Sequence, residues 1–370
     1  MSLDILGVGT AVPPYFILQE DAARLASSFV DTEGRRERAL RALYRRTGVS
    51  KRHSVMLEAN EGTAHERQTL YPPSTGPDDP GPTTEVRMSR YERDAPDLAI
   101  AAARTALEAS GLEGRDLTHL VTVSCTGFFS PGVDAAVIEE LGLCRTVHRT
   151  HVGFMGCHGT LNGLRVAGSF AAARPEARVL VSSVELCSLH YAYGADPDLL
   201  VANALFADGA GALVGASDGS SRNGPAPSLH RWRVLDSATL LMPDSAEAMS
   251  WRIGAHGFRM TLSARVPDLI RRHLAPWVEE WLGSHDLRVG DVGSWAVHPG
   301  GPRIVDAVRD ALALENDQVG VSREVLAEYG NMSSATILFI LERLRESQAR
   351  LPCVAMAFGP GLVVEAALIG

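Results

Sequence analysis

Short runs of apolar and β-branched residues alternate with longer helical patterns along most of this chain, and this alternation limits the folds available to it. Residues 117–127, 177–186, 209–216, 292–300 and 352–370 have the composition of strands. Residues 95–111, 159–174, 266–283 and 333–347 have helical apolar spacing. The pattern predicts an α/β protein whose helices cover a sheet. A chain of 370 residues with 45% hydrophobic content can bury the large core that such a fold needs.

Two segments interrupt the alternation. Residues 58–90 are rich in proline, glycine, threonine and charge, which predicts a long excursion at the surface. Residues 216–230, "ASDGSSRNGPAPSLH", have the composition of a linker. Each flanking half contains a strand that leads to a glycine-flanked polar residue, in "VGFMGCHG" and in "SWAVHPGG". We therefore expect two loosely similar α/β halves, residues 1–220 and 221–370.

Charge and hydropathy exclude several classes of protein. The net charge of −9 and the lack of an interleaved basic and aromatic run argue against nucleic-acid binding. No window approaches the length of a membrane span, and the first residues lack a signal-peptide pattern, so we expect a cytoplasmic protein. Five scattered cysteines without a Cys-x-x-Cys pair fit a reducing compartment and do not form a disulfide framework.

Cys157 lies between two glycines where a strand-like run meets a helix-like run. A helix N-terminus and a nearby imidazolium both favour a thiolate, so this position suits a nucleophile that glycines leave open to a substrate. Two alternatives stay open at this point. The thiol can be a small core residue, or it can bind a metal with His151 and His158, although the spacing matches no zinc pattern.

Two further polar residues stand where α/β proteins place their chemistry. His298 ends an apolar strand and is followed by Pro-Gly-Gly and a helical pattern, and loops at the carboxyl ends of strands commonly carry ligands. Asn331 precedes a strongly apolar helix. It can be a plain N-cap, or it can donate an amide hydrogen bond to a developing oxyanion.

Four motifs in order, "GFMGCHG", "AVHPGGPRI", "EYGNMSSA" and "AFGPGLVVE", resemble the type III polyketide synthases, the chalcone synthase-like branch of the thiolase superfamily. The resemblance covers nearly the whole chain. It implies a five-layered α-β-α-β-α thiolase-like fold built from two similar halves, one carrying Cys157 and the other His298 and Asn331. It also implies a homodimer that uses acyl-CoA and malonyl-CoA as substrates without a separate cofactor or metal.

The resemblance implies a mechanism for these three residues. Cys157 would accept an acyl group from acyl-CoA, and His298 would pair with the sulfur so that it stays ionised. Malonyl-CoA would lose carbon dioxide, and His298 and Asn331 would donate hydrogen bonds to the thioester oxygen of the resulting enolate. This carbanion would attack the acyl-enzyme, and the extended chain would close to a ring.

The resemblance also implies a substrate cavity. Phe206 matches the family's gatekeeping phenylalanine, which lies where the CoA tunnel meets the cavity. Met260 matches a second gatekeeping position, which is a phenylalanine in chalcone synthases. Cys187 and His190 stand where chalcone synthases carry threonines, and Ser333 is compatible with a tunnel for an acyl chain. His190 would shorten the cavity or donate a hydrogen bond to a polyketide carbonyl.

The CoA arm is expected to enter past Gly300, Gly301 and Arg303. A basic cluster could hold the CoA phosphates, although an ordinary solvated surface explains it nearly as well. The cluster consists of Arg45, Arg46, Lys51 and Arg52.

The segments "VELCSLHY" and "CTGFFSPG" resemble bacterial synthases that extend fatty acyl starters into alkylpyrones or alkylresorcinols. We therefore expect a fatty acyl-CoA starter. Two alternatives remain from the sequence: an initiating β-ketoacyl synthase that performs one condensation, and a catalytically silent partner subunit of the same fold.

Overall fold

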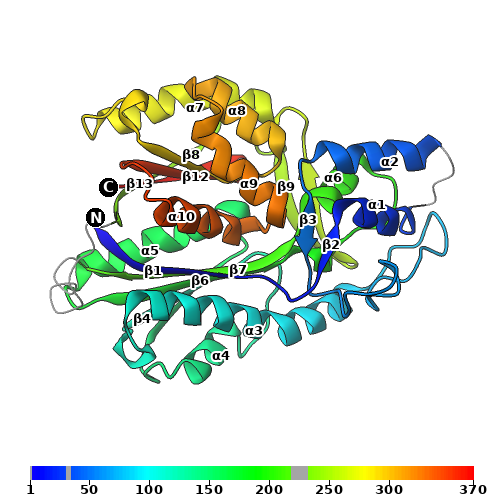
Figure 1. The fold of residues 1–370 in the computed structure, drawn as a ribbon, viewed down its shortest axis with the longest axis horizontal. Helices are drawn as coiled ribbons and strands as arrows, with labels where there is room; N and C mark the ends of the chain where they lie inside the picture. Colours follow the sequence, from blue (N-terminus) through cyan, green and yellow to red (C-terminus); the bar gives the residue numbers. More distant parts are fainter. Residues whose placement is uncertain (1, 31–34, 218–231) are drawn as a thin grey trace.

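The computed structural model describes residues 2–30, 35–217 and 232–370, and its elements stack in five layers (Figure 1). The outer helices on one side are α7 (Val266–Gly283) and α8 (Pro302–Leu312). Below them lie β8 (Trp232–Leu241), β12 (Cys353–Gly359) and β13 (Val363–Ile369). The middle layer holds α5 (Gly159–Ala173) and α10 (Thr336–Glu346). Strands β1 (Leu3–Ala11), β6 (Arg178–Leu186) and β7 (Asp208–Ala216) follow, covered by α3 (Thr84–Ser110) and α4 (Val133–Glu140). The predicted five-layered thiolase-like fold is confirmed.

The main strands of the described chain follow the order β11-β12-β13-β8-β1-β7-β6-β4-β5, with β4 at His119–Ser124, β5 at His148–Gly153 and β11 at Ser294–Val297. Strands of residues 1–220 lie on one side of this order and strands of residues 221–370 on the other. The two groups meet where Leu3–Ile5 of β1 pairs antiparallel with residues 232–234 of β8. The division at residue 220 stays a prediction, because most of the expected linker at 216–230 lies outside the described residues.

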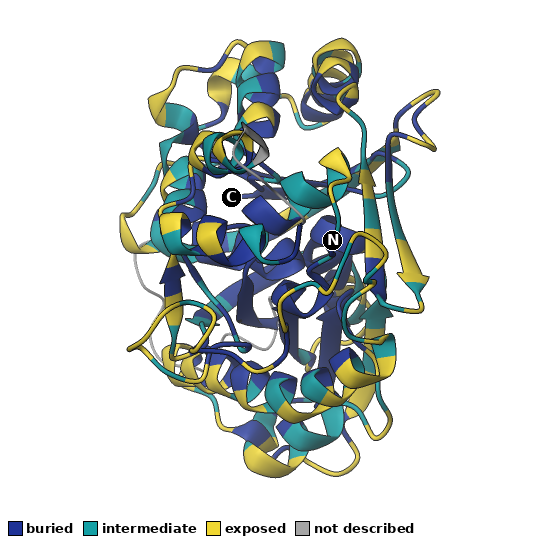
Figure 2. Ribbon diagram, turned by 90° about the vertical axis from the view of Figure 1, so that its right-hand side faces the viewer, coloured by how far each residue is buried: buried dark blue, intermediate teal, exposed yellow. Residues whose placement is uncertain are grey.

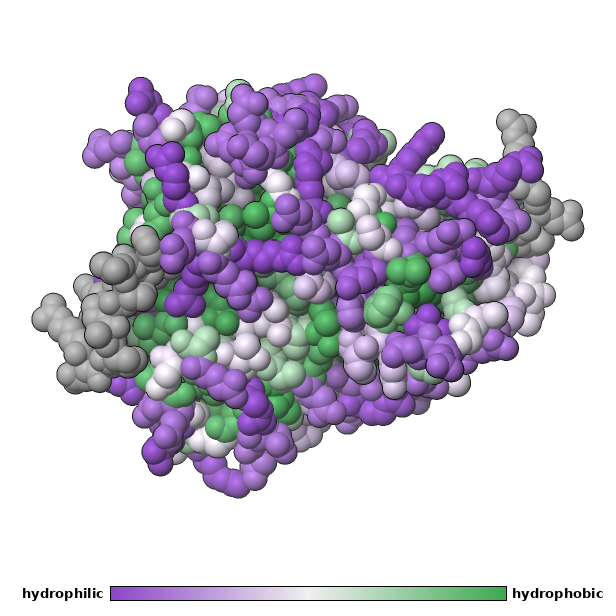
Figure 3. Space-filling model, viewed as in Figure 1, coloured by the Kyte–Doolittle hydropathy of each residue, from purple (hydrophilic) through white to green (hydrophobic). Residues whose placement is uncertain are grey.

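The middle helices are apolar because both of their faces meet a sheet. Thr336 to Leu341 of α10 are all buried, as expected for a helix that is hydrophobic all round. In α5, a Cβ added at Gly163 would lie 3.0 Å from Val123 of β4, so the glycine allows the helix to approach the sheet closely. Figure 2 shows these central elements buried and the outer helices exposed, and Figure 3 shows mostly hydrophilic side chains over the face seen in Figure 1.

The helix predicted at 95–111 begins earlier than expected. Helix α3 starts at Thr84 and continues through Pro96 to Ser110. The Thr83 side chain accepts a hydrogen bond from the Val86 N–H and so caps the helix. The end is as predicted, since Gly111 adopts a left-handed conformation. The surface excursion is therefore shorter, and its last residues are helical.

The remaining elements gather at one end of the molecule, at the right of Figure 1. They include β2 (Phe16–Leu18), α1 (Gln19–Ser27), α2 (Arg35–Arg46), β3 (Lys51–His53) and α6 (Pro197–Leu205). A separate hairpin, β9 (Met249–Gly254) with β10 (Gly257–Leu262), borders this end, and helix α9 (Gly320–Tyr329) lies nearer the centre, beside α10. No helix within the described ranges has the length and apolarity that a membrane crossing requires.

Candidate active site

Cys157 lies in a short turn, Gly156–His158, between β5 and the buried start of α5. Gly156 has φ of 77°, and a Cβ there would lie 2.4 Å from Cδ of Pro360, so the turn requires glycine. Phe154, three residues before Cys157, also adopts a positive φ of 61°, which is costly for a bulky side chain. The turn that carries Cys157 is therefore held in one shape against the C-terminal Gly-Pro-Gly segment.

The thiol of Cys157 is buried, and the side chains of Ser333 and Asn331 are hydrogen-bonded to it. Burial raises the pKa of Cys157 to about 12, and these two hydrogen bonds oppose the rise. This direction is opposite to the one that the sequence led us to expect, because the thiol is almost completely enclosed.

His298 directly follows β11, and its N–H donates a 2.8 Å hydrogen bond to the carbonyl of Met356 in β12. Burial lowers the pKa of its imidazole to about 3, so the ring is neutral at physiological pH. Within the described residues, neither ring nitrogen has a hydrogen-bond partner. One nitrogen can therefore accept a proton while the other donates one, and the site contains a neutral thiol and a neutral imidazole.

Asn331 connects the cysteine turn to the histidine loop. Its side chain is hydrogen-bonded to Cys157, and its Nδ2 donates to the carbonyl of Gly300 at 3.4 Å, while the Gly300 N–H donates to the carbonyl of His298 at 3.0 Å. Its Oδ1 accepts from the Ser333 N–H at 2.8 Å. The N-cap alternative is wrong, because the residues at the N-caps of the turn Ser333–Ala335 and of α10 are Met332 and Ala335. Asn331 instead presents its amide to the sulfur.

A cavity with an empty volume of about 580 Å³, mouth included, opens onto Cys157. All five side chains that the sequence placed in a cavity line it: Phe206, Met260, Cys187, His190 and Ser333. The other residues that line it are Cys125, Thr126, Gly156, Tyr191, Ala192, Leu199, Ala202, Asn203, Met249, Trp251, Phe258 and Pro360. None of the described residues of this lining is an acid, a lysine or an arginine.

His190 cannot bind a polyketide carbonyl as one of our two hypotheses required. Its Nε2 lies 2.7 Å from the carbonyl of Thr126 and must donate to it, which leaves Nδ1 to accept from the Phe258 N–H at 3.0 Å. Burial lowers the pKa of His190 to about 3, so the ring is neutral. Both nitrogens are occupied, and the ring stacks on Phe258 at 4.1 Å. His190 therefore acts as a wall of the cavity.

Sequence reasoning found Met260 but missed its partners on the same hairpin. Met249 and Trp251 of β9, with Phe258 of β10, face the cavity together with Met260, because alternate residues of a strand share one face. Trp251 also donates from Nε1 to the carbonyl of Cys125 at 2.8 Å. The period of two along residues 249–260 was the available signal.

Three cysteines face this cavity, and their surroundings differ. Burial raises the pKa of all three thiols, and the charge of Glu185 adds to the rise at each of them. Ser333 is hydrogen-bonded to both Cys125 and Cys157, and Asn331 is hydrogen-bonded to Cys157. Cys157 is therefore the cysteine that has both Ser333 and Asn331 as partners.

Glu185, which the sequence analysis did not single out, lies fully buried at the end of β6. Its carboxylate accepts from the Cys125 N–H at 3.0 Å, from Thr126 Oγ1 at 2.7 Å and from Ser334 Oγ. Burial raises its pKa against these hydrogen bonds. Glu185 thereby fixes the strand ends that carry Cys125 and Thr126 into the cavity.

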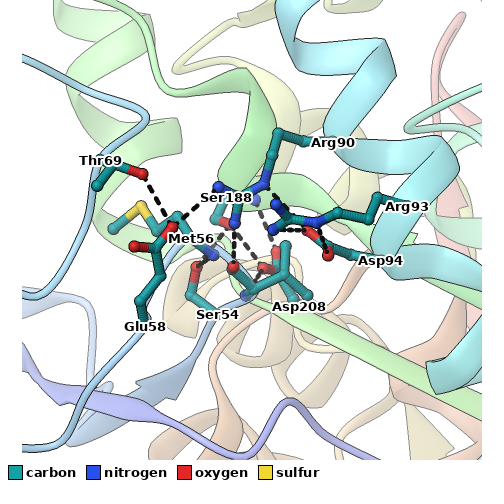
Figure 4. Close-up of polar contacts among 10 residues, drawn as sticks. Ser54, Met56, Glu58, Thr69, Arg90, Arg93, Asp94, Ser188 and Asp208 are labelled. Carbon is teal, nitrogen blue, oxygen red and sulfur yellow. Dashed lines mark hydrogen bonds and ion pairs between the residues drawn. The ribbon is translucent and has the colours of Figure 1, made fainter.

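A second buried carboxylate, Asp208, supports the turn Cys187–His190 (Figure 4). It accepts from the N–H of Ser188 at 2.7 Å, from Ser188 Oγ at 2.6 Å and from the Val55 N–H at 2.8 Å. Burial raises the pKa of Asp208 to about 6. No local motif marks this residue, because its donors come from distant parts of the chain.

The expected CoA entrance is only partly supported. Arg303 is exposed and follows Gly300 and Gly301 at the start of α8. In the basic cluster, Arg45 and Arg46 are exposed and Lys51 is partly exposed.

The position of Arg52 shows that our prediction that it binds CoA phosphates is wrong. It is only 1% exposed, and its Nη1 donates to the carbonyls of Asn203 at 2.6 Å and Phe206 at 2.9 Å. Its guanidinium also lies over the rings of Tyr44 and Tyr191. A basic residue on the inward face of β3 is buried, and the sequence did not show which face β3 turns inward.

The metal alternative has no support in the described part of the chain, where no three His, Cys, Asp or Glu side chains are grouped to hold an ion. His151 contacts Thr122 Oγ1 through Nδ1 at 3.0 Å, and His158 contacts Asn162 Oδ1 through Nδ1 at 2.8 Å.

Comparison with known proteins agrees with this geometry. The family described as chalcone and stilbene synthases, N-terminal domain, matches residues 2–219, and the corresponding C-terminal domain matches residues 234–370. The chain is 32% identical over 372 residues to the alpha-pyrone synthesis polyketide synthase-like Pks18 of Mycobacterium tuberculosis, across 98% of this chain and 90% of that protein. It is 33% identical over 371 residues to the 1,3,6,8-tetrahydroxynaphthalene synthase of Streptomyces peucetius, across 99% and 92%.

Among solved structures, PKS-I from the brown alga Ectocarpus siliculosus matches with a TM-score of 0.88 and 31% identity, across 99% of this chain and 97% of that chain. The chain is therefore an acyltransferase enzyme with a thiolase-like fold. It belongs to the chalcone and stilbene synthase family, the type III polyketide synthases. This family condenses acyl-CoA with malonyl-CoA, which decides against the ketoacyl synthase and silent-subunit alternatives.

Proposed function

We propose that this enzyme loads a fatty acyl group from acyl-CoA onto Cys157, extends it with malonyl-CoA and cyclises the product to an alkylpyrone or alkylresorcinol. The observation that carries the proposal is the cavity above Cys157. Its lining has no formal charge, since His190 is neutral, and Met249, Trp251, Phe258 and Met260 supply an apolar wall. Such a surface favours a hydrocarbon chain over a charged starter.

The neutral thiol and imidazole suit the first step. As Cys157 Sγ attacks the acyl-CoA carbonyl, its proton passes to a free ring nitrogen of His298, and CoA leaves as a thiol after taking up a proton. Proton transfer from Cys157 to His298 therefore takes place only when the substrate carbonyl oxygen is present to accept the negative charge.

The second step uses the same groups as donors. Malonyl-CoA loses carbon dioxide, and the enolate oxygen accepts hydrogen bonds from Asn331 Nδ2 and from the imidazole N–H of His298. The enolate carbon then attacks the acyl carbonyl on Cys157, the bond from that carbon to sulfur breaks, and the Cys157 thiolate that leaves takes up a proton. The Gly300 carbonyl, which accepts from Asn331, orients the amide for this role.

We further propose a cytoplasmic homodimer. Phe128 and Met155, beside the nucleophile turn, are 39% and 40% exposed, which favours an apolar contact with a second copy. Arg45, Arg46, Lys51 and Arg303 remain candidates for the CoA phosphates, with Gly300 and Gly301 beside the pantetheine arm.

The test is an incubation of the purified protein with acyl-CoAs of increasing chain length and radiolabelled malonyl-CoA. We expect carbon dioxide release and extended cyclic products, with the highest kcat/KM for a long-chain starter. Equal or better use of short or aromatic starters would contradict the fatty acyl assignment, and the absence of any extended product would contradict the synthase activity.

A further inference from the structure

One wall of the acyl cavity is a hairpin that does not belong to the main sheet. Strands β9 and β10 pair only with each other among the described residues, and their cavity face carries Met249, Trp251, Phe258 and Met260. A two-stranded ribbon is marginally stable by itself. Its position, and with it the shape of the cavity, therefore depends on what holds it from outside.

The tip of the hairpin is attached to the end of the Pro-rich excursion. The Thr84 N–H donates to the carbonyl of Ala255 at 2.8 Å. Thr84 Oγ1 accepts from the Gly257 N–H at 2.9 Å and donates to the carbonyl of Gly254. His256 Nδ1 lies 2.9 Å from the carbonyl of Gly81 and must donate to it. One threonine thus joins both strands of the hairpin at its tip.

Arg87, one turn further along α3, joins the same tip to the opposite wall. It is completely buried, and its Nη1 donates to the carbonyls of Leu189 at 2.7 Å and Tyr191 at 2.9 Å, on either side of His190. A Cβ at Gly257 would lie 3.1 Å from its Cζ, so the guanidinium packs against the first residue of β10. The start of α3 therefore spans both walls, at His190 and at Phe258.

We infer that Thr84 is a positioning residue that sets which acyl chains the enzyme accepts, by fixing the β9–β10 hairpin as a wall of the cavity. This inference rests on the proposed condensation at Cys157, and it gives the surface excursion a role that its composition did not predict. Thr84 does not line the cavity, so it acts only through the hairpin.

The experiment compares Thr84→Val, which keeps the shape and removes the hydroxyl, with Thr84→Ser, which keeps the hydroxyl. For each full-length variant, kcat/KM is measured with a long-chain and a short-chain acyl-CoA, alongside Tm and the rate of malonyl-CoA decarboxylation. We expect Thr84→Val, which loses the hydroxyl contacts with Gly254 and Gly257, to change the long-to-short ratio by at least about fivefold, the size of effect that even one lost hydrogen bond brings. Decarboxylation should stay within about twofold, and Thr84→Ser should keep the wild-type ratio.

If Thr84 is only structural, Thr84→Val lowers activity toward both starters in parallel and leaves their ratio unchanged, and this result would overturn the inference. Equal shifts of the ratio in Thr84→Ser and Thr84→Val would also overturn it. If Thr84→Val does not fold, His256→Leu removes the second attachment of the tip and should shift the ratio likewise. A wild-type ratio in a folded His256→Leu would then overturn it. Absence of condensation in the wild-type enzyme would instead refute the proposed function, and this inference with it.

Discussion

Replacing Arg52 by methionine should destabilise the fold, although the sequence suggested a surface residue that binds phosphate. The guanidinium donates to the carbonyls of Asn203 and Phe206 at 2.6 and 2.9 Å, and charged hydrogen bonds of this kind contribute about 1.5–3 kcal/mol each. Part of the loss is offset, because Nε and Nη2 of Arg52 are buried without partners among the described residues and disappear with the substitution. We expect a net loss of about 2–4 kcal/mol.

Lys51→Met is the matched control, because Lys51 is the neighbouring residue on the outward face of β3. Its stability should change by less than about 0.5 kcal/mol. The assay is the midpoint of urea unfolding for both variants, followed by KM for an acyl-CoA and for the same acyl group on N-acetylcysteamine, which lacks the CoA phosphates.

The two roles give opposite kinetic results. If Arg52 is structural, Arg52→Met changes KM for both thioesters alike. The reason is that the Phe206 carbonyl loses its hydrogen bond to Arg52, so Phe206, which lines the cavity, shifts. If Lys51 meets the phosphates, Lys51→Met raises KM for the acyl-CoA alone. An Arg52→Met protein with the wild-type urea midpoint and a KM raised only for acyl-CoA would refute our account of this residue.

Three further substitutions test the buried contacts of the site. Burial raises the pKa of Asp208 to about 6 in the folded protein, whereas an aspartate in the unfolded chain has a pKa near 4. The protonated carboxyl therefore contributes its full stabilisation below about pH 4, and this contribution is lost as the pH rises through 6. Between about pH 4 and pH 7, wild type should therefore lose ~3 kcal/mol of unfolding free energy relative to Asp208→Asn, and a constant difference would contradict this. Gly359→Ala places a Cβ 2.3 Å from Cδ2 of His158 and should cost about 1–3 kcal/mol and slow turnover. Gly283→Ala, with no heavy atom within 4 Å of its added Cβ, is its control, and equal Tm values would show that our packing argument fails. Trp251→Phe removes the 2.8 Å hydrogen bond to Cys125 and should lower stability by about 1 kcal/mol; an unchanged urea midpoint would rule the bond out as a stabilising contact.

The apolar period of strands and helices predicted an α/β protein whose helices cover a sheet, whereas the five layers and the cavity residues were predicted from the resemblance to the type III polyketide synthases. Phe206 and Cys187 are examples, since both line the cavity. The partners of Met260 on the hairpin were missed because residues 249–260 carry no recognisable motif and come near Cys157 only through tertiary packing.

Burial was the property least visible from the sequence. Arg52 is enclosed on the buried side of β3 by residues more than sixty positions away. The two contacts that occupy the ring nitrogens of His190 also come from residues at that distance in the sequence. The pKa directions of Cys157 and His298 follow from the same enclosure. A helix N-terminus suggested a thiolate, and the sequence did not show how completely the thiol is enclosed.

The most direct test of acyl transfer at this site is mass spectrometry of the enzyme after brief exposure to a long-chain acyl-CoA. Cys125, Cys157 and Cys187 face the same cavity, so peptide mapping of the acyl adduct distinguishes among them. We predict one acyl group per chain on Cys157, and a folded Cys157→Ala protein that acquires none. An adduct on Cys125 or Cys187, or loading that persists in Cys157→Ala, would contradict our assignment of the nucleophile.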